Sequence, residues 1–184
     1  MDDNTQGLSI RNTLGLTLNE GFRKWVQMGM TAFATHRLRN YNLPNLQDTT
    51  LTRQRWSEND LSVGVELARE KGRFIHYRAT GELFLIGEKA GDFDVRGNVD
   101  LDIPLGKWDS LLVNIKGRVG NELPGFYYRH YHAQSAWWDN ALNRESRGKI
   151  DGTISLKRVG TRVRIGFENI TNYTYFGMDN TLKE

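Results

Sequence analysis

Charged side chains occupy every second position along several stretches of this sequence, a spacing that suits a wet surface in contact with ions and solutes. In the clearest stretch, residues 92–103, Asp, Arg and Asn alternate with Phe, Val, Gly, Leu and Ile. Because successive side chains of a β-strand point to opposite faces, such a stretch has one apolar and one charged face. The residues that we expect on charged faces are Glu66, Asp94, Arg96, Asp100, Asp102, Lys116, Arg118, Lys149, Asp151, Arg162, Arg164 and Glu168.

Two interpretations of these charged residues are open. They could line an aqueous lumen and bias which solutes pass, since rings of charged side chains tune pore selectivity. They could also form a solvated sheet face whose ion pairs are incidental. In either case we expect a mixed-sign ladder, in which each cross-strand pair contributes about 0.2–1 kcal/mol. The expected pairs bring Asp94, Asp100 and Asp102 near Lys116 and Arg118.

Patterns for catalysis or metal binding are weak. His132 lies near Ser135, but this neighbourhood has no glycine elbow and no recognisable acid to orient the histidine. His130 and His132 are two residues apart, so a strand would point both to one side, where they could hold a metal ion or join a polar aromatic cluster. No third ligand is evident. We therefore predict that the protein is not an enzyme and has no catalytic residues, cofactor or metal site.

The elements that must position the charged residues are β-strands, because the apolar residues recur with a period of two. The predicted strands cover residues 8–18, 24–37, 60–70, 73–86, 92–103, 110–120, 125–136, 148–157 and 161–175, and residues 40–59 form a long loop. The other connections are short turns rich in glycine, so consecutive strands pair antiparallel. The fold class is therefore all-β, an antiparallel up-and-down meander of about nine long strands in a single segment, residues 1–184.

Composition narrows the class of protein. The chain of 184 residues is 38% hydrophobic and 26% charged, and no stretch approaches the roughly 18 apolar residues of a membrane-spanning helix. The net charge of +3 is spread along the chain without a basic block, so nucleic acid is not an expected partner. Cysteine is absent, which excludes a disulfide framework and thiolate chemistry.

A two-faced meander can turn its apolar face inward or outward. In a soluble barrel or sandwich the apolar face points inward, whereas in an outer-membrane barrel it meets lipid and the charged face lines a wet lumen. The predicted strands, of roughly 10–14 residues, match a tilted spanning strand better than the usual soluble strand of about five or six. Aromatic residues gather at strand ends, as interfacial girdles do: Phe22, Trp25, Trp108, Phe126, Tyr127, Tyr128, Trp137, Trp138, Tyr173, Tyr175 and Phe176. Both features favour the membrane orientation.

Three short aromatic motifs follow one another along the chain. They are Glu-Gly-Phe-Arg-Lys-Trp at 20–25, Phe-Tyr-Tyr-Arg-His-Tyr-His at 126–132 leading to Trp-Trp-Asp-Asn at 137–140, and Asn-Tyr-Thr-Tyr-Phe at 172–176. In this order over a meander, the sequence resembles the putative porin family of Bacteroides-type outer-membrane β-barrels. The resemblance implies longer chains with a signal peptide and a closed barrel, so we expect this chain to be an internal fragment of such a transmembrane barrel.

The function that the resemblance implies is passive diffusion of small hydrophilic solutes through a channel in the bacterial outer membrane. The partners would then be the lipid bilayer of that membrane and the solutes themselves. The alternative is a soluble β-barrel or β-sandwich that binds a ligand or a partner without catalysis.

Overall fold

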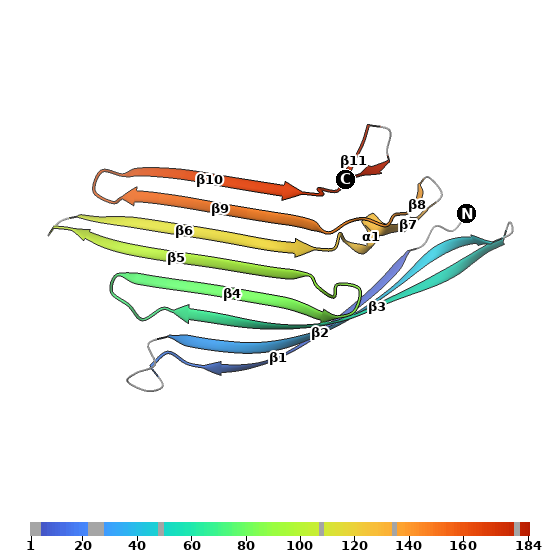
Figure 1. The fold of residues 1–184 in the computed structure, drawn as a ribbon, viewed down its shortest axis with the longest axis horizontal. Helices are drawn as coiled ribbons and strands as arrows, with labels where there is room; N and C mark the ends of the chain where they lie inside the picture. The colour runs from blue at the N-terminus through green and yellow to red at the C-terminus, as the bar shows by residue number, and fades with distance from the viewer. Residues whose placement is uncertain (1–4, 22–27, 48–49, 107–108, 134–135, 179–180) are drawn as a thin grey trace.

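Eight strands form one antiparallel sheet in the order β1-β2-β3-β4-β5-β6-β9-β10 (Figure 1). The computed structural model describes residues 5–21, 28–47, 50–106, 109–133, 136–178 and 181–184, with the backbone alone for residues 46–47 and 50–51. The strands are β1 (Gln6–Leu18), β2 (Gly29–Gln47), β3 (Thr50–Arg69), β4 (Ile75–Ile86), β5 (Phe93–Leu105), β6 (Asp109–Glu122), β9 (Glu145–Leu156) and β10 (Thr161–Thr171). The predicted all-β antiparallel meander is confirmed.

The connection between β6 and β9 is not a strand of this sheet. It contains the single-turn helix α1 (Phe126–Arg129) and the short paired strands β7 (His130–His132) and β8 (Trp137–Asp139). The predicted strand at residues 125–136 is therefore wrong, and the sheet has eight strands instead of nine. The physical reason is that Pro124 and Gly125 follow the end of β6 and disfavour a further strand. In the aromatic run that comes next, polar and apolar residues do not alternate.

The predicted loop at residues 40–59 is also wrong, because β2 and β3 continue through it. Their pairing runs without a break from Gly29 opposite Ala68 to Gln47 opposite Thr50. Polar residues such as Asn40 and Arg55 lie on the face that is apolar elsewhere, so the alternation used for the prediction disappears although the backbone ladder persists.

Several other predicted boundaries shift. The last long strand ends at Thr171, four residues before the predicted end, and two short strands, β11 (Tyr175–Phe176) and β12 (Leu182–Lys183), pair beyond it. The start of the predicted strand at 24–37, together with Phe22, Trp25 and Trp108, lies outside the described residues.

The register divides the sheet into an apolar face and a charged face. Directly opposed residues of neighbouring strands point to the same side. One row of opposed residues crosses all eight strands and contains only apolar residues and glycine: Leu18, Met30, Leu67, Ala79, Gly97, Gly117, Ile150 and Phe167. The apolar face is therefore continuous from one edge of the sheet to the other.

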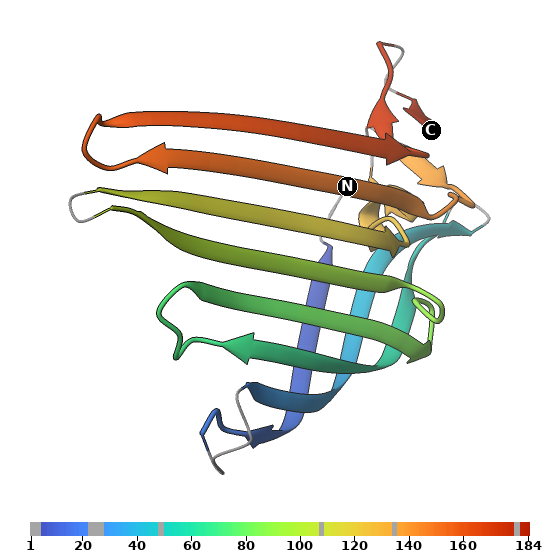
Figure 2. The ribbon, with the colours of Figure 1, turned by 60° about the vertical axis from the view of Figure 1, so that its left-hand side comes forward.

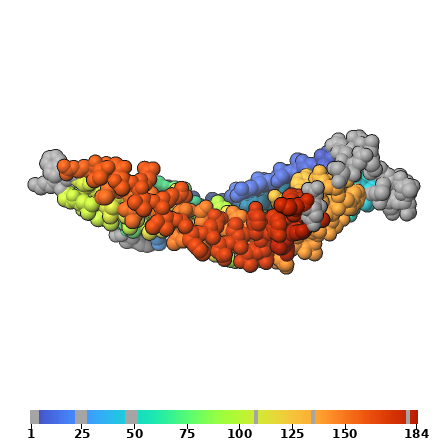
Figure 3. All heavy atoms as spheres, turned by 90° about the horizontal axis from the view of Figure 1, so that it is seen from above, coloured from blue at the N-terminus to red at the C-terminus, as the bar shows by residue number. Residues whose placement is uncertain are grey.

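The sheet is a thin, curved layer (Figure 3), and its apolar face is uncovered. Leu14, Leu16 and Ile165 on the two edge strands are 77%, 79% and 74% exposed. Among the described residues the buried large hydrophobic side chains are Leu43, Phe84 and Phe126. Burial is thus concentrated at the end of β2 and β3 where the β6–β9 connection lies beside them (Figure 2).

Candidate functional site on the charged face

The register places every charged residue predicted from the sequence on the charged face of the sheet. One row of opposed residues runs from Glu66 through Thr80, Arg96, Arg118 and Lys149 to Glu168. Neighbouring rows contain Asp94, Asp100, Asp102, Lys116, Asp151, Arg162 and Arg164. These side chains therefore share one surface, and their lining of a lumen stays a prediction.

Three cations are directly opposed in this row, which by itself is unfavourable. Carboxylates relieve the repulsion between Arg96, Arg118 and Lys149. Asp94 accepts a hydrogen bond from Nε of Arg118 at 2.5 Å and also pairs with Arg96, and Nζ of Lys149 lies 3.2 Å from Oε2 of Glu168. The expected pair of Asp94 with Arg118 is confirmed.

The other expected pairs of the ladder do not form. Asp100 faces Asn114 across the ladder and accepts a hydrogen bond from its amide nitrogen at 2.6 Å. Asp102 faces Leu112. Among the described residues, neither Asp102 nor Lys116 takes part in an ion pair. The prediction correctly made β5 and β6 neighbours, but it did not include the register between them. It was therefore wrong about which residues face each other.

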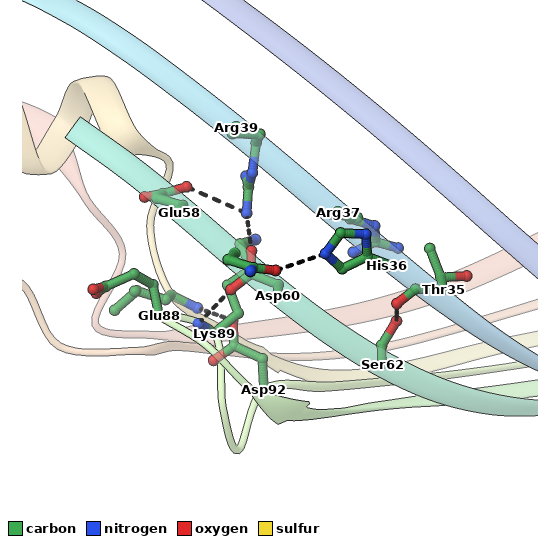
Figure 4. Close-up of polar contacts among 12 residues, drawn as sticks. Thr35, His36, Arg37, Arg39, Glu58, Asp60, Ser62, Glu88, Lys89 and Asp92 are labelled. Atoms are coloured by element: carbon green, nitrogen blue, oxygen red, sulfur yellow. Dashed lines mark hydrogen bonds and ion pairs between the residues drawn. The ribbon is translucent and has the colours of Figure 1, made fainter. Parts of the chain in front are cut away.

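A second group of charges lies where β2 and β3 extend beyond the rest of the sheet (Figure 4). Arg39, Glu58, Asp60 and Arg129 form what we call the buried charge cluster. Asp60 is fully buried, pairs with Nη2 of Arg39 and accepts the backbone N–H of Lys89 at 3.1 Å. Glu58 pairs with Arg129 and lies 3.3 Å from Arg39. The cluster holds two cations and two carboxylates, as burial of charge requires.

The turn between β4 and β5 completes this cluster and passes very close to β3. Gly87 in the turn has φ of 105°, and a Cβ atom there would lie 2.2 Å from the backbone oxygen of Asn59. Glycine is therefore needed for this approach. The approach brings the backbone N–H of Lys89 to Asp60.

Residues 123–133 and 136–144, which we call the covering segment, lie against the charged face at this end. Phe126 stacks on Tyr41 with ring centroids 3.8 Å apart, and His130 stacks on Trp56 at 4.1 Å. Phe126 is only 4% exposed, so its expected place in an exposed aromatic girdle is wrong. The covering segment is the reason that charges on β2 and β3 are buried.

Both ends of the covering segment are tied to Asp92, which is fully buried at the start of β5. Its carboxylate accepts the backbone N–H of Leu123 and Nε of Arg144, each at 2.8 Å. Arg144 also donates to the backbone oxygen of Ala90 at 2.7 Å. One carboxylate thus fixes where the segment leaves β6 and where it returns to β9.

His132 fastens the middle of the covering segment to β2. Its ring is almost fully buried and stacks on Trp137, with centroids 3.9 Å apart. Nδ1 lies 2.9 Å from the backbone oxygen of Pro44, and Nε2 lies 3.0 Å from Oδ2 of Asp139. Through these two ring nitrogens His132 links the backbone of β2 to the β7–β8 hairpin.

Asp139 is the carboxylate that both histidines of β7 contact. Nδ1 of His130 lies 2.7 Å from its Oδ1. Partial burial acts to raise the pKa of Asp139, but the hydrogen bonds from His130 and His132 outweigh it and hold this pKa below its usual value. Asp139 is therefore ionised and anchors the β7–β8 hairpin.

Both histidines that the sequence offers for catalysis or metal binding, His130 and His132, lie on β7. Ser135 lies outside the described residues. Within the described part, no group of three or more His, Cys, Asp or Glu side chains is arranged to hold a metal ion.

Sequence reasoning missed the buried charge cluster because it placed Glu58 in a loop and Arg129 in a strand of the meander. A signal was present. Glu58, Asp60 and Ser62 continue backward the alternation of β3, with polar residues at every second position. The contribution of Arg129 had no such signal, since it depends on how the covering segment folds.

The sequence from residue 1 to residue 183 matches the family described as "Putative porin". The chain belongs to this family. No curated protein and no solved structure matches it. In the described residues of this porin-family chain, no helix combines the length and the apolar character needed to cross a membrane.

Family membership and the eight-stranded meander agree with each other. A putative porin is expected to be built from long antiparallel strands, and the sheet of this porin-family chain has strands of 11 to 20 residues.

Proposed function

We propose that this chain forms part of the wall of an outer-membrane β-barrel channel, through which small hydrophilic solutes diffuse passively. The observation that carries the proposal is the uninterrupted apolar face, which crosses eight strands and is left exposed. Large exposed apolar surfaces on proteins mark contact with lipid or with another protein. An apolar face outside and a charged face inside is the arrangement of a membrane barrel.

The lengths of the strands support the same proposal. β5 and β6 have 13 and 14 residues, and a tilted strand needs about 9–11 residues to cross the hydrocarbon core. The strands are therefore long enough to cross and to reach water at both ends.

The lengths of the connections at the two ends of the sheet support an orientation of the proposed wall in the membrane. Residues 157–160 form a short turn between β9 and β10, whereas the covering segment lies at the opposite end of the sheet (Figure 1). Outer-membrane barrels have short periplasmic turns and longer extracellular loops. We therefore propose that the covering segment lies inside the channel, near its extracellular mouth, and narrows it there.

A soluble sandwich is the weaker alternative. It would need a second sheet packed about 10 Å from the apolar face. The described residues supply one large sheet, whose apolar face is exposed. Porin family membership also favours the channel.

The proposal is tested on the complete protein that carries this chain, purified from outer membranes and inserted into planar lipid bilayers. We expect discrete conductance steps and a folded form that migrates differently before and after heating. A folded protein recovered in the soluble fraction, without conductance in bilayers, would overturn the proposal.

A matched pair of variants tests which face meets lipid. Ile165→Lys puts a charge on the apolar face, where a lysine at mid-membrane costs about 2–4 kcal/mol. Asn114→Lys puts the same charge on the charged face, opposite Asp100, and we expect a change of about 0.5 kcal/mol or less. The measurement is the free energy of unfolding by urea in lipid vesicles. Equal costs for the two variants would contradict the assignment of the faces.

A further inference from the structure

A cavity of about 440 Å³ lies between the charged face and the covering segment. Its floor is made by Arg118 and Glu122 of β6 and by Glu145 and Arg147 of β9. Its walls include Lys89 from the β4–β5 turn and two tyrosines, Tyr128 of α1 and Tyr173 after β10. The volume falls within the range of about 300–1,000 Å³ that is typical of small-molecule sites.

The two carboxylates on the floor are held side by side by separate arginines. Glu122 and Glu145 are directly opposed across β6 and β9, an arrangement that is unfavourable for two anions alone. Nη2 of Arg118 lies 2.6 Å from Oε1 of Glu122, and Nη2 of Arg147 lies 2.8 Å from Oε1 of Glu145. Each carboxylate is therefore balanced within the floor itself.

This balance determines the chemistry that the cavity can bind. The two arginines and the two glutamates of the floor compensate one another, so the floor itself favours neither a free anion nor a free cation. Both ion pairs use Oε1 of the glutamate, and a carboxylate can accept about four hydrogen bonds in all. The floor thus offers both hydrogen-bond donors and acceptors, which suits a neutral ligand with many hydroxyl groups.

The tyrosines supply flat apolar surface beside these polar groups. Tyr128 and Tyr173 are 44% and 52% exposed although both line the cavity. Tyr173 is placed by Asn172, which adopts φ of 57° and donates from Nδ2 to the backbone oxygen of Arg144 at 3.1 Å. Asparagine tolerates this left-handed conformation, so the chain turns sharply after β10 and brings Tyr173 to the cavity.

We propose that this cavity is a binding subsite for a neutral saccharide. The arginines and glutamates hydrogen-bond its hydroxyl groups, and the tyrosine rings pack on the C–H faces of the sugar ring. The proposal rests on the proposed function, because the saccharide reaches the cavity from the channel. It also names the class of solute that binds during passage through the channel.

The test uses the complete protein in planar bilayers, with maltotriose, xylotriose and triacetylchitotriose as neutral probes. We expect at least one of them to interrupt the ion current, with an affinity that changes less than twofold between 0.1 and 1 M salt, because no net charge is recognised. Tyr173→Ala is expected to weaken that affinity at least tenfold. Glu122→Gln together with Glu145→Gln is expected to weaken it similarly while the conductance persists.

Tyr175→Ala is the matched control. Tyr175 is exposed to a similar extent, at 44%, and follows Tyr173 by two residues, but it does not line the cavity. We expect a change in affinity of less than twofold. The two rings stack with centroids 6.4 Å apart. An equal loss in both tyrosine variants would therefore show that the local structure of this pair matters in place of a contact between Tyr173 and the saccharide, and would overturn the role of Tyr173.

The outcomes separate this proposal from the channel itself. Conductance without interruption by any of the three saccharides overturns the subsite and leaves the channel proposal standing. Stronger block by gluconate or by glucosamine than by the neutral sugars also overturns it. Without conductance the channel proposal fails, and the subsite is then decided by calorimetric titration of the detergent-solubilised protein with the same saccharides.

Discussion

The charged face carries ion pairs in two settings that differ in their exposure to water. In the open part, on β9 and β10, Arg164 is 68% exposed where it pairs with Asp151 at 3.1 Å. In the buried charge cluster, Asp60 is fully buried where it pairs with Arg39. Asp151 and Arg39 are 16% and 19% exposed, so the two pairs of arginine with aspartate differ mainly in their other partners. Arg164 lies in water, whereas Asp60 does not.

This difference separates two tasks of the charged face. An exposed ion pair contributes about 0–1 kcal/mol, because water and salt screen it. A buried pair that loses one partner leaves an uncompensated charge, which costs about 3–5 kcal/mol. The open pairs can thus change in sequence at little cost in stability, as the lining of the proposed channel would require, whereas the buried charge cluster holds the covering segment in place.

The largest effect is expected from Asp60→Ala. Loss of this carboxylate leaves Arg39 with Glu58 alone, which also pairs with Arg129, and leaves the N–H of Lys89 without its acceptor. The cluster then holds two cations and one carboxylate, so we expect a loss of about 3–5 kcal/mol in the free energy of unfolding. Asp151→Ala is the matched control, with an expected loss of about 0–1 kcal/mol. Urea titrations of both variants in vesicles give the comparison, and similar losses would refute the contrast between the two regions.

A smaller effect is expected from Asp139→Asn at the other anchor of the covering segment. The side chain of Asp139 is 49% exposed, so we expect a cost of about 1 kcal/mol. Because folding lowers the pKa of Asp139, its contribution is complete above the ordinary aspartate pKa near 4. It is lost as the pH falls through the lower pKa of the folded state.

Hydrogen exchange of the β7–β8 hairpin between pH 3 and pH 6 measures this anchor. In the wild type, protection of residues 130–139 is expected to decrease toward acid after correction for intrinsic exchange. Asp139→Asn is expected to be less protected throughout, with a smaller dependence on pH. If protection in the variant decreased toward acid as much as in the wild type, a titrating group other than Asp139 would be responsible for the decrease.

The smallest effect on stability, and a clear effect on permeation, is expected from reversing both Arg162 and Arg164 to glutamate. Both lie on the charged face of the edge strand β10. We expect the free energy of unfolding to change by about 1 kcal/mol or less and the channel to shift toward cations. Reversal potentials across a salt gradient measure the shift. An unchanged ion selectivity would contradict the prediction that these two residues line the lumen.

The sequence was sufficient for the parts of the fold that depend on alternation alone. The stretch at 92–103 became β5, and its charged residues share the face predicted for them. Alternation identifies a face because it reports on each strand separately, and short turns then order the strands.

Register and long-range burial could not be predicted in the same way. Asp100 meets Asn114 and not a cation because of a register that no local pattern shows. Glu58 is buried where the covering segment brings Arg129, far away in sequence, to its carboxylate. Both facts depend on contacts between distant segments, and a single sequence carries little information on such contacts.

The order of the strands also implies an order of assembly. From β1 to β6 each strand pairs with its neighbour in sequence, so the sheet can grow one hairpin at a time at a low cost in loop closure. The pairing of β6 with β9 is the exception, because residues 123–144 intervene. Arg129 contacts Glu58 of β3 and His132 contacts Pro44 of β2, across 71 and 88 residues of the chain. Contacts between such distant residues close long loops, so we expect this segment to dock after the β2–β3 hairpin has formed.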